Sequence, residues 1–178
     1  MKIGRINFLL VLCLLSFGSK AQSENPSYNA ATSQLIVPSA DSVTQPGIYQ
    51  DNVFEFLPNG YWRLVSNNTG AKIRWIDHVE LIKTATFPVQ IFLKVSGTFR
   101  SGCERLGKIS QRRVNNTFEV FLYYRPMVTH EPVACTANVT LFSEVVPLSV
   151  YDLVAGDYAY TVNGSLNGTF NLASDNSL

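Results

Sequence analysis

Short runs in which apolar and polar residues alternate fill much of this 178-residue chain. Two clear runs place every second residue on one face: Val89, Ile91, Leu93 and Val95, and Phe118, Val120, Leu122 and Tyr124. A period of two is typical of a β-strand with one buried face. Turn-forming pairs such as Asn115-Asn116 and Asn163-Gly164 separate the runs. The pattern predicts an all-β fold, and six to eight such strands favour a two-sheet antiparallel sandwich.

The N-terminus has the parts of an export signal peptide. Lys2 and Arg5 precede an apolar run over residues 8–17, and small residues lead to a cut after Ala21. We expect residues 1–21 to be removed and the protein to be periplasmic or secreted; the alternative is a buried core helix. Cys13 lies inside the apolar run instead of just after it, so no lipid anchor is expected. No later segment is long and apolar enough for a membrane span.

Two cysteines, Cys103 and Cys135, remain once residues 1–21 are removed. An even pair in an oxidising compartment favours a disulfide bond over two free thiols, which is the alternative. Each cysteine precedes an expected strand, and 32 positions separate the two. A bridge would therefore fasten the starts of two strands, and we interpret the pair as structural and not reactive.

Changes in composition divide the rest of the chain. Residues 22–47 are rich in Ser, Asn, Ala, Thr and Pro and contain one short apolar run, which predicts a flexible tail or linker. Residues 48–76 predict a β-hairpin extension, because Asn59-Gly60 supplies a tight turn between two strand-like runs. Residues 77–178 then form the expected sandwich domain.

The motifs of the C-terminal part resemble a known family. They are Gly97 followed by Gly102-Cys103, then Cys135-Thr136, Pro147-Leu148, Ala155-Gly156 with Tyr158, and Val162-Asn163-Gly164. Over about residues 77–173 the chain is similar to an uncharacterised family of small bacterial exported Ig-like β-sandwich domains. The resemblance implies an Ig-like sandwich and supports the Cys103–Cys135 bridge. It implies no reaction. The expected fold is thus a two-sheet antiparallel Ig-like sandwich with an N-terminal β-hairpin extension.

The charge balance argues against a nucleic-acid partner. Removing Lys2, Arg5 and Lys20 from the 14 basic residues leaves 11, against 13 acidic residues, for a net charge of −2. Phosphate binding needs a basic surplus on one face. One basic cluster exists: Arg100, Arg105, Lys108, Arg112 and Arg113. We interpret it as a solvated strand face, with an anionic partner as the alternative.

The sequence contains no pattern of catalytic or metal-binding residues. His78 and His130 are the only histidines, and they stand far apart. A zinc site needs three or four ligands with clustered spacing. No Gly-x-Ser-x-Gly elbow, phosphate-binding glycine loop or paired carboxylates stand out. We therefore expect no metal, no cofactor and no enzyme activity.

Binding is the function that remains. Three aromatic residues, Tyr61, Trp62 and Trp75, are candidates for facing a ligand, although packing of their segment onto the sandwich would use them equally well. We expect an exported, non-catalytic β-sandwich interaction module whose partner is a protein or glycan of the cell envelope. The alternative is a carbohydrate-binding or enzyme-inhibitor domain.

Overall fold

The computed structural model describes residues 25–127 and 133–178. Every regular element in these ranges is a β-strand, which confirms the all-β class. No helix in the described ranges is long and apolar enough to cross a membrane. The expected signal peptide, Cys13 and His130 lie outside the described residues.

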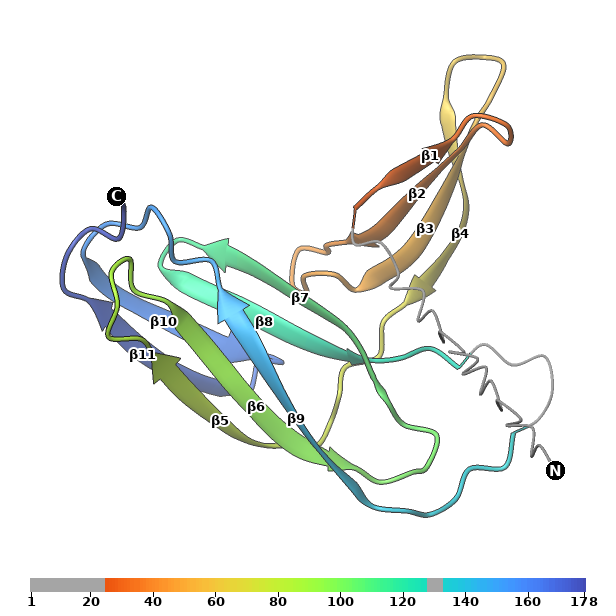
Figure 1. The fold of residues 1–178 in the computed structure, drawn as a ribbon. Helices are drawn as coiled ribbons and strands as arrows, with labels where there is room; N and C mark the ends of the chain where they lie inside the picture. Colours follow the sequence, from red (N-terminus) through yellow and green to blue (C-terminus); the bar gives the residue numbers. More distant parts are fainter. Residues whose placement is uncertain (1–24, 128–132) are drawn as a thin grey trace, which may run out of the picture.

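The first four strands form a sheet of their own, which we call the N-terminal sheet (Figure 1). Its order is β1-β2-β3-β4, and all its pairs are antiparallel. The strands are β1 (Ser27–Asn29), β2 (Gln34–Ala40), β3 (Tyr49–Phe56) and β4 (Trp62–Thr69). β3 and β4 are the expected hairpin, and Gly60 has a φ of 84° in its turn. The hairpin is half of a larger sheet.

The tail expected over residues 22–47 differs in the structure, because β1 and β2 lie there. The short apolar run of this segment pairs with β3, and Leu35 lies opposite Phe54. The backbone hydrogen-bond partners of this run are therefore residues about twenty positions further along the chain. Local composition does not report such a partner, so a polar segment with one apolar run resembled a linker.

Seven further strands form the sandwich, in two sheets (Figure 1). The three-stranded sheet has the order β5-β6-β9, and the four-stranded sheet has the order β11-β10-β8-β7. The first comprises β5 (Ile76–Lys83), β6 (Ile91–Phe99) and β9 (Thr140–Leu148). The second comprises β7 (Leu106–Val114), β8 (Thr117–Tyr124), β10 (Gly156–Val162) and β11 (Leu166–Leu172). The two-sheet sandwich is confirmed.

One strand pair in the sandwich is parallel. β10 runs parallel to β8, with Ala159 opposite Thr117 and Val162 opposite Val120. After β8 the chain crosses to the three-stranded sheet as β9 and then returns, so it re-enters the four-stranded sheet in the direction of β8. The remaining pairs are antiparallel, as expected.

The core lies between the two sheets of the sandwich. Its fully buried side chains come from both sheets and include Leu93, Val95, Val120, Leu122 and Val162. β6 shows the expected alternation of buried and more exposed residues. β8 does not, because Phe121 and Tyr123 on its outer face are buried as well. Another part of the chain must cover the outer face of β8. The N-terminal sheet contacts the sandwich at this face.

The cysteine pair lies at one end of the sandwich. The Sγ atoms of Cys103 and Cys135 are 1.99 Å apart, as in a disulfide bond. Nearby, the amide of Gly102 donates a 2.8 Å hydrogen bond to the carbonyl oxygen of Thr136. The bridge therefore joins the loop before β7 to the segment before β9, consistent with the structural role expected from the sequence.

Candidate functional site

The connection between β2 and β3 covers the outer face of β8. The hydroxyl of Tyr123 donates a buried hydrogen bond of 2.7 Å to the carbonyl oxygen of Pro46. Gln50, at the start of β3, has no exposed surface. A side chain on Gly70 would overlap both Gln50 and the Tyr123 ring, so glycine is required for this close approach. These contacts bury the outer face of β8, which would be exposed to solvent in an isolated sandwich.

Two members of the basic cluster, Arg112 and Lys108, hold this connection and the strands beside it. Arg112 donates 2.8 Å hydrogen bonds to the carbonyl oxygens of Ser42 and Val43, and a 2.7 Å hydrogen bond to the Glu119 carboxylate. A planar guanidinium suits this role because it donates in several fixed directions at once. Arg112 is therefore a structural anchor for residues 42–43, which the interpretation of the cluster as a solvated face did not predict.

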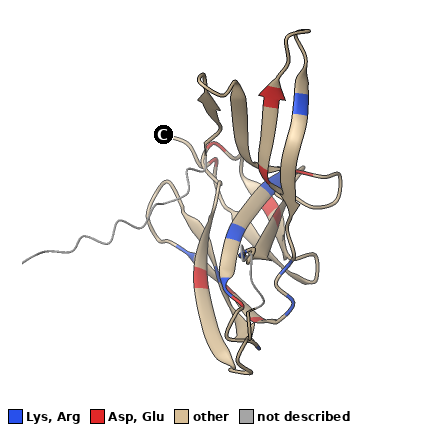
Figure 2. Cartoon of the chain, turned by 90° about the vertical axis from the view of Figure 1, so that its right-hand side faces the viewer, with Lys and Arg blue, Asp and Glu red and all other residues tan. Residues whose placement is uncertain are grey.

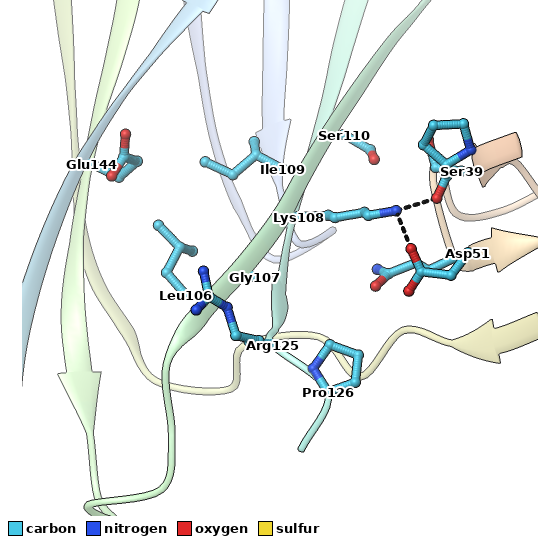
Figure 3. Close-up of a pocket in the computed structure, with 12 residues that line it drawn as sticks. Ser39, Asp51, Leu106, Gly107, Lys108, Ile109, Ser110, Arg125, Pro126 and Glu144 are labelled. Carbon is cyan, nitrogen blue, oxygen red and sulfur yellow. Dashed lines mark hydrogen bonds and ion pairs between the residues drawn. The ribbon is translucent and has the colours of Figure 1, made fainter. Parts of the chain in front are cut away.

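Lys108 is the second anchor. Its ammonium group contacts the carbonyl oxygen of Pro38 and donates a 2.9 Å hydrogen bond to Oδ1 of Asp51 (Figure 3). Pro38 lies on β2 and Asp51 on β3, so one side chain of β7 holds two strands of the N-terminal sheet. With Arg112 and Tyr123, it ties the N-terminal sheet to the sandwich at three points.

A pocket of about 370 Å³ opens beside Lys108, between the N-terminal sheet and the edges of β7 and β9 (Figure 3). Leu106 and Ile109 provide its apolar lining, while Arg125 and Glu144 add one charge of each sign. Oε1 of Gln50 is buried and has no donor among the described residues. The lining contains no cysteine or histidine, and no group of three metal-binding side chains occurs in the described ranges.

The N-terminal sheet presents one apolar face, which we define by residues that share it through cross-strand pairing. They are Tyr28, Leu35, Val37, Phe54, Phe56, Trp62 and Leu64. Residues opposite one another in antiparallel strands lie on the same face, so Tyr28, Leu35, Phe54 and Leu64 form one row. Asn52, which is buried, lies opposite Val37 and so shares this face, but the face carries no charged residue.

Three aromatic rings, those of Tyr28, Phe56 and Trp62, form a cluster at the end of the apolar face that lies farthest from the sandwich, which we call its distal end. The Tyr28 and Trp62 rings meet edge-on, with centroids 6.1 Å apart, and the Phe56 and Trp62 rings are 5.1 Å apart and tilted by 56°. Tyr28 is 57% exposed, Trp62 46% and Leu64 49%. Large apolar side chains exposed together on one face are a feature of interaction surfaces.

The charges of the N-terminal sheet lie elsewhere. Its strands contain three charged residues: Asp51, Glu55 and Arg63. Glu55 and Arg63 pair across β3 and β4 on the opposite face, with 2.6 Å between Arg63 Nη2 and Glu55 Oε2. Asp51 is turned toward Lys108. Figure 2 shows how sparse the charged positions are on this sheet.

The structure separates the three aromatic residues that the sequence singled out. Trp62 belongs to the apolar face, and Tyr61, 71% exposed, precedes it in the hairpin turn. Trp75 lies beyond the other end of β4 and is 39% exposed. The Arg100 guanidinium covers its ring at 3.4 Å from the centroid. An eight-residue strand is roughly 26 Å long, so Trp62 and Trp75 do not form one surface.

Sequence reasoning missed several residues of the apolar face. Phe54 and Phe56 alternate in the run before Asn59-Gly60, and that period alone indicates a shared face. Tyr28 lies in the segment taken for a tail, and nothing local connects it with Trp62. Only the strand order brings Tyr28 to this surface.

Comparison with known families supports the sandwich part of this description. Residues 93–172 match the family model of the ORF11 beta-sandwich domain. The match to the ORF11 beta-sandwich domain runs from β6 to the end of β11 and leaves out β5 and the N-terminal sheet. No curated protein and no solved structure matches the chain. The apolar face therefore lies in the part that the family match does not cover, whereas the anchoring side chains Lys108, Arg112 and Tyr123 lie inside it.

Proposed function

We propose that this chain is an exported, non-catalytic interaction module that binds a protein of the cell envelope through the apolar face of the N-terminal sheet. The observation that carries the proposal is that face itself: seven apolar residues, no charge and a partly exposed aromatic cluster. Clustered aromatic side chains at the centre of an interface commonly contribute most of its binding energy.

The way the sheet is held supports the same function. Tyr123 and Arg112 hold the connection between β2 and β3, and Lys108 holds the two strands themselves. The aromatic cluster at the other end of the sheet stays exposed. In Figure 1 the hairpin tips of the sheet point away from the sandwich. A surface that is ordered before it binds loses less conformational entropy on binding. The sandwich thus acts as a rigid support for the binding face.

Glycan binding is the alternative for the same residues. Its support is the exposed ring of Tyr61 beside Trp62. Sugar recognition usually stacks a flat ring face on the ligand, whereas the Tyr28 and Trp62 rings meet at 81° and cover part of each other. This arrangement favours an irregular apolar protein surface as the partner.

Site-specific photocrosslinking in the native host tests the proposal. A benzoylphenylalanine in place of Tyr61 lies beside the apolar face, and the same replacement of Tyr151, an exposed residue between β9 and β10, is the matched control. We expect covalent adducts with one envelope protein from position 61 and none from position 151. The change Trp62→Ser should suppress them.

Equal adduct patterns from the two positions, or none from position 61, would contradict the proposal. A change in tryptophan fluorescence on titration with envelope glycans, lost in Trp62→Ser, would favour the glycan alternative. Trp75 is fluorescent too, so the Trp62→Ser variant also shows which tryptophan reports the binding.

A further inference from the structure

The outer edge of β4 is an unpaired strand edge. β4 is the last strand of the N-terminal sheet, and all eight of its residues are exposed. Among the described residues no strand pairs with its outer side. Such an edge presents main-chain N–H and C=O groups to solvent and can accept another strand.

Hydrogen bonds in the hairpin show which main-chain groups face outward. The amide of Phe56 donates 2.9 Å to the carbonyl oxygen of Ser33, so the polar groups of Phe56 point toward β2. Main-chain groups alternate in direction along a strand, so those of Glu55 point toward Arg63 of β4. Trp62 and Leu64, the neighbours of Arg63, therefore turn their N–H and C=O groups to the free edge. Their side chains lie on the apolar face.

The edges of the sandwich carry features that oppose such pairing. β7 contains Lys108, Arg112 and Arg113, and β9 contains Pro147 and the partly buried Glu144. Charges, proline and irregular register are the usual means by which proteins protect strand edges.

The remaining edges are protected too. β5 carries four ionisable residues: Asp77, His78, Glu80 and Lys83. The ammonium group of Lys83 donates a 2.7 Å hydrogen bond to the carbonyl oxygen of Asn171, which caps the edge of β11. β1 is only three residues long.

β4 has few of these features. Its single charge, Arg63, is paired with Glu55 on the face away from the aromatic cluster. It has no proline. Its register with β3 shifts twice, at an extra residue of β4, Val65, and at an extra residue of β3 between Gln50 and Val53, and both shifts lie on the C-terminal side of Leu64. Among the described edge strands with more than three residues, β4 combines a single, paired charge with partly exposed tryptophan and leucine side chains.

We propose that two copies of this chain pair through their β4 edges, antiparallel about a two-fold axis at Leu64. A two-fold axis joins identical surfaces, so the chain must be compatible with itself there. With the axis at Leu64, Arg63 lies opposite Val65 of the second copy, and no like charges oppose each other. The two N-terminal sheets then form one continuous sheet, and their apolar faces become one surface.

This dimer does not depend on the proposed function. If the apolar face binds an envelope protein, the dimer presents two such faces together. If that binding fails in the crosslinking test, the pairing of the β4 edges still has its own prediction. The two proposals can therefore fail separately.

Sedimentation of the full chain, as recovered from cells, tests the dimer. We expect the native chain to sediment with about twice the monomer mass. Leu64→Lys places two like charges at the axis and should give monomers. Leu64→Gln, an uncharged residue of similar length, should keep at least part of the dimer at the same concentration. Leu64 is half exposed, so neither change should prevent folding, and thermal unfolding of both variants checks this.

A cysteine crosslink tests the register. Leu64→Cys places two thiols opposite each other at the axis and should give a disulfide-linked dimer on a non-reducing gel. Leu141→Cys, an exposed position on β9, is the control and should stay monomeric. A native chain that sediments as a monomer would overturn the proposal, and so would crosslinking that is equal at the two positions.

Discussion

The hydroxyl of Tyr123 donates a hydrogen bond of 2.7 Å to the carbonyl oxygen of Pro46, 77 residues earlier in the chain. Both residues are buried, one on the outer face of β8 and the other in the connection between β2 and β3. This bond marks the point where the N-terminal sheet covers a face that a free sandwich would expose.

Removal of this hydroxyl should weaken the junction. Tyr123→Phe leaves the buried carbonyl oxygen of Pro46 without its donor, and such a loss costs about 1–3 kcal/mol. Urea unfolding should show a lower free energy of unfolding by this amount. Tyr151→Phe, at an exposed tyrosine, is the control and should change the free energy by less than about 0.5 kcal/mol.

Alkaline pH should lower the free energy of unfolding through the same residue, Tyr123. Burial raises the pKa of Tyr123 from 10.0 to about 12; the nearby Asp41 acts in the same direction and Arg112 opposes it. The unfolded chain then loses this proton at lower pH than the folded one. The contribution of Tyr123 to stability is complete below pH 10 and is lost as the pH rises through about 12.

Unfolding free energies measured at pH 9 and pH 11 should therefore fall less in Tyr123→Phe than in the native protein. Equal losses in the two proteins would show that the phenol of Tyr123 does not titrate at higher pH in the folded state. The comparison of two pH values within each protein removes the constant cost of the lost hydrogen bond.

Asn163 should be sensitive to substitution. Its side chain accepts a 2.8 Å hydrogen bond from the amide of Leu122 and donates one of 2.8 Å to the carbonyl oxygen of Ile73. It is buried and has a φ of 51°. Asn163→Ala should lower the unfolding free energy by about 1–3 kcal/mol through the lost hydrogen bonds. Strain at positive φ adds roughly 1 kcal/mol.

Asn163→Gly separates these two effects, because glycine accepts this φ but makes no side-chain hydrogen bond. Its cost should be smaller than that of alanine by the strain alone. A glycine variant as stable as the native protein would mean that the hydrogen bonds of Asn163 contribute nothing.

The disulfide bond should stabilise the sandwich mainly by restricting the unfolded chain. Closing a loop of 32 positions between Cys103 and Cys135 contributes about 3–4 kcal/mol in the chain-entropy description. The double change Cys103→Ser and Cys135→Ser should lower the unfolding free energy by that amount. The β-sheet circular dichroism spectrum at low temperature should not change. Addition of a reductant to the native protein should reproduce the loss and have no effect on the double variant.

Arg112 should control access to residues 41–45. Arg112→Lys keeps the charge but loses the planar arrangement of donors that reaches Ser42 and Val43. If the substitution lowers the free energy that keeps this segment closed by about 1.4 kcal/mol, the open form becomes roughly tenfold more populated. A protease that acts on the open form should then cleave the segment roughly tenfold faster. Arg113→Lys, an exposed neighbour, is the control, and equal cleavage of the two variants would contradict the anchoring role.

Several elements follow from local sequence because the physics that forms them is local. The alternation around Leu93 and Val120 specifies strands with one apolar face, and β6 and β8 lie there. Asn59-Gly60 specifies a turn because glycine accepts a positive φ, and β3 and β4 flank it. Cys103 and Cys135 were expected to pair, and their sulfur atoms are at bonding distance.

The candidate site was less predictable. Trp62 was identified as a candidate, but its contacts with Tyr28 and Phe56 depend on strand order. The sequence groups Trp75 with it, although Trp62 begins β4 and Trp75 lies beyond its other end. Lys108 and Arg112 were interpreted as solvated, because their acceptors on β2, β3 and the connection between them are about 60 to 70 residues away.

The sequence by itself determined where strands form, where turns separate them and which cysteines are able to pair. Tertiary structure alone decided that β8 is buried on both faces and that the segment before Tyr49 supplies two strands. It also decided that, among the described residues, the aromatic end of the apolar face stays partly exposed. The physical reason is that alternation shows that a strand has an apolar face. What covers that face depends on contacts between residues far apart in the chain.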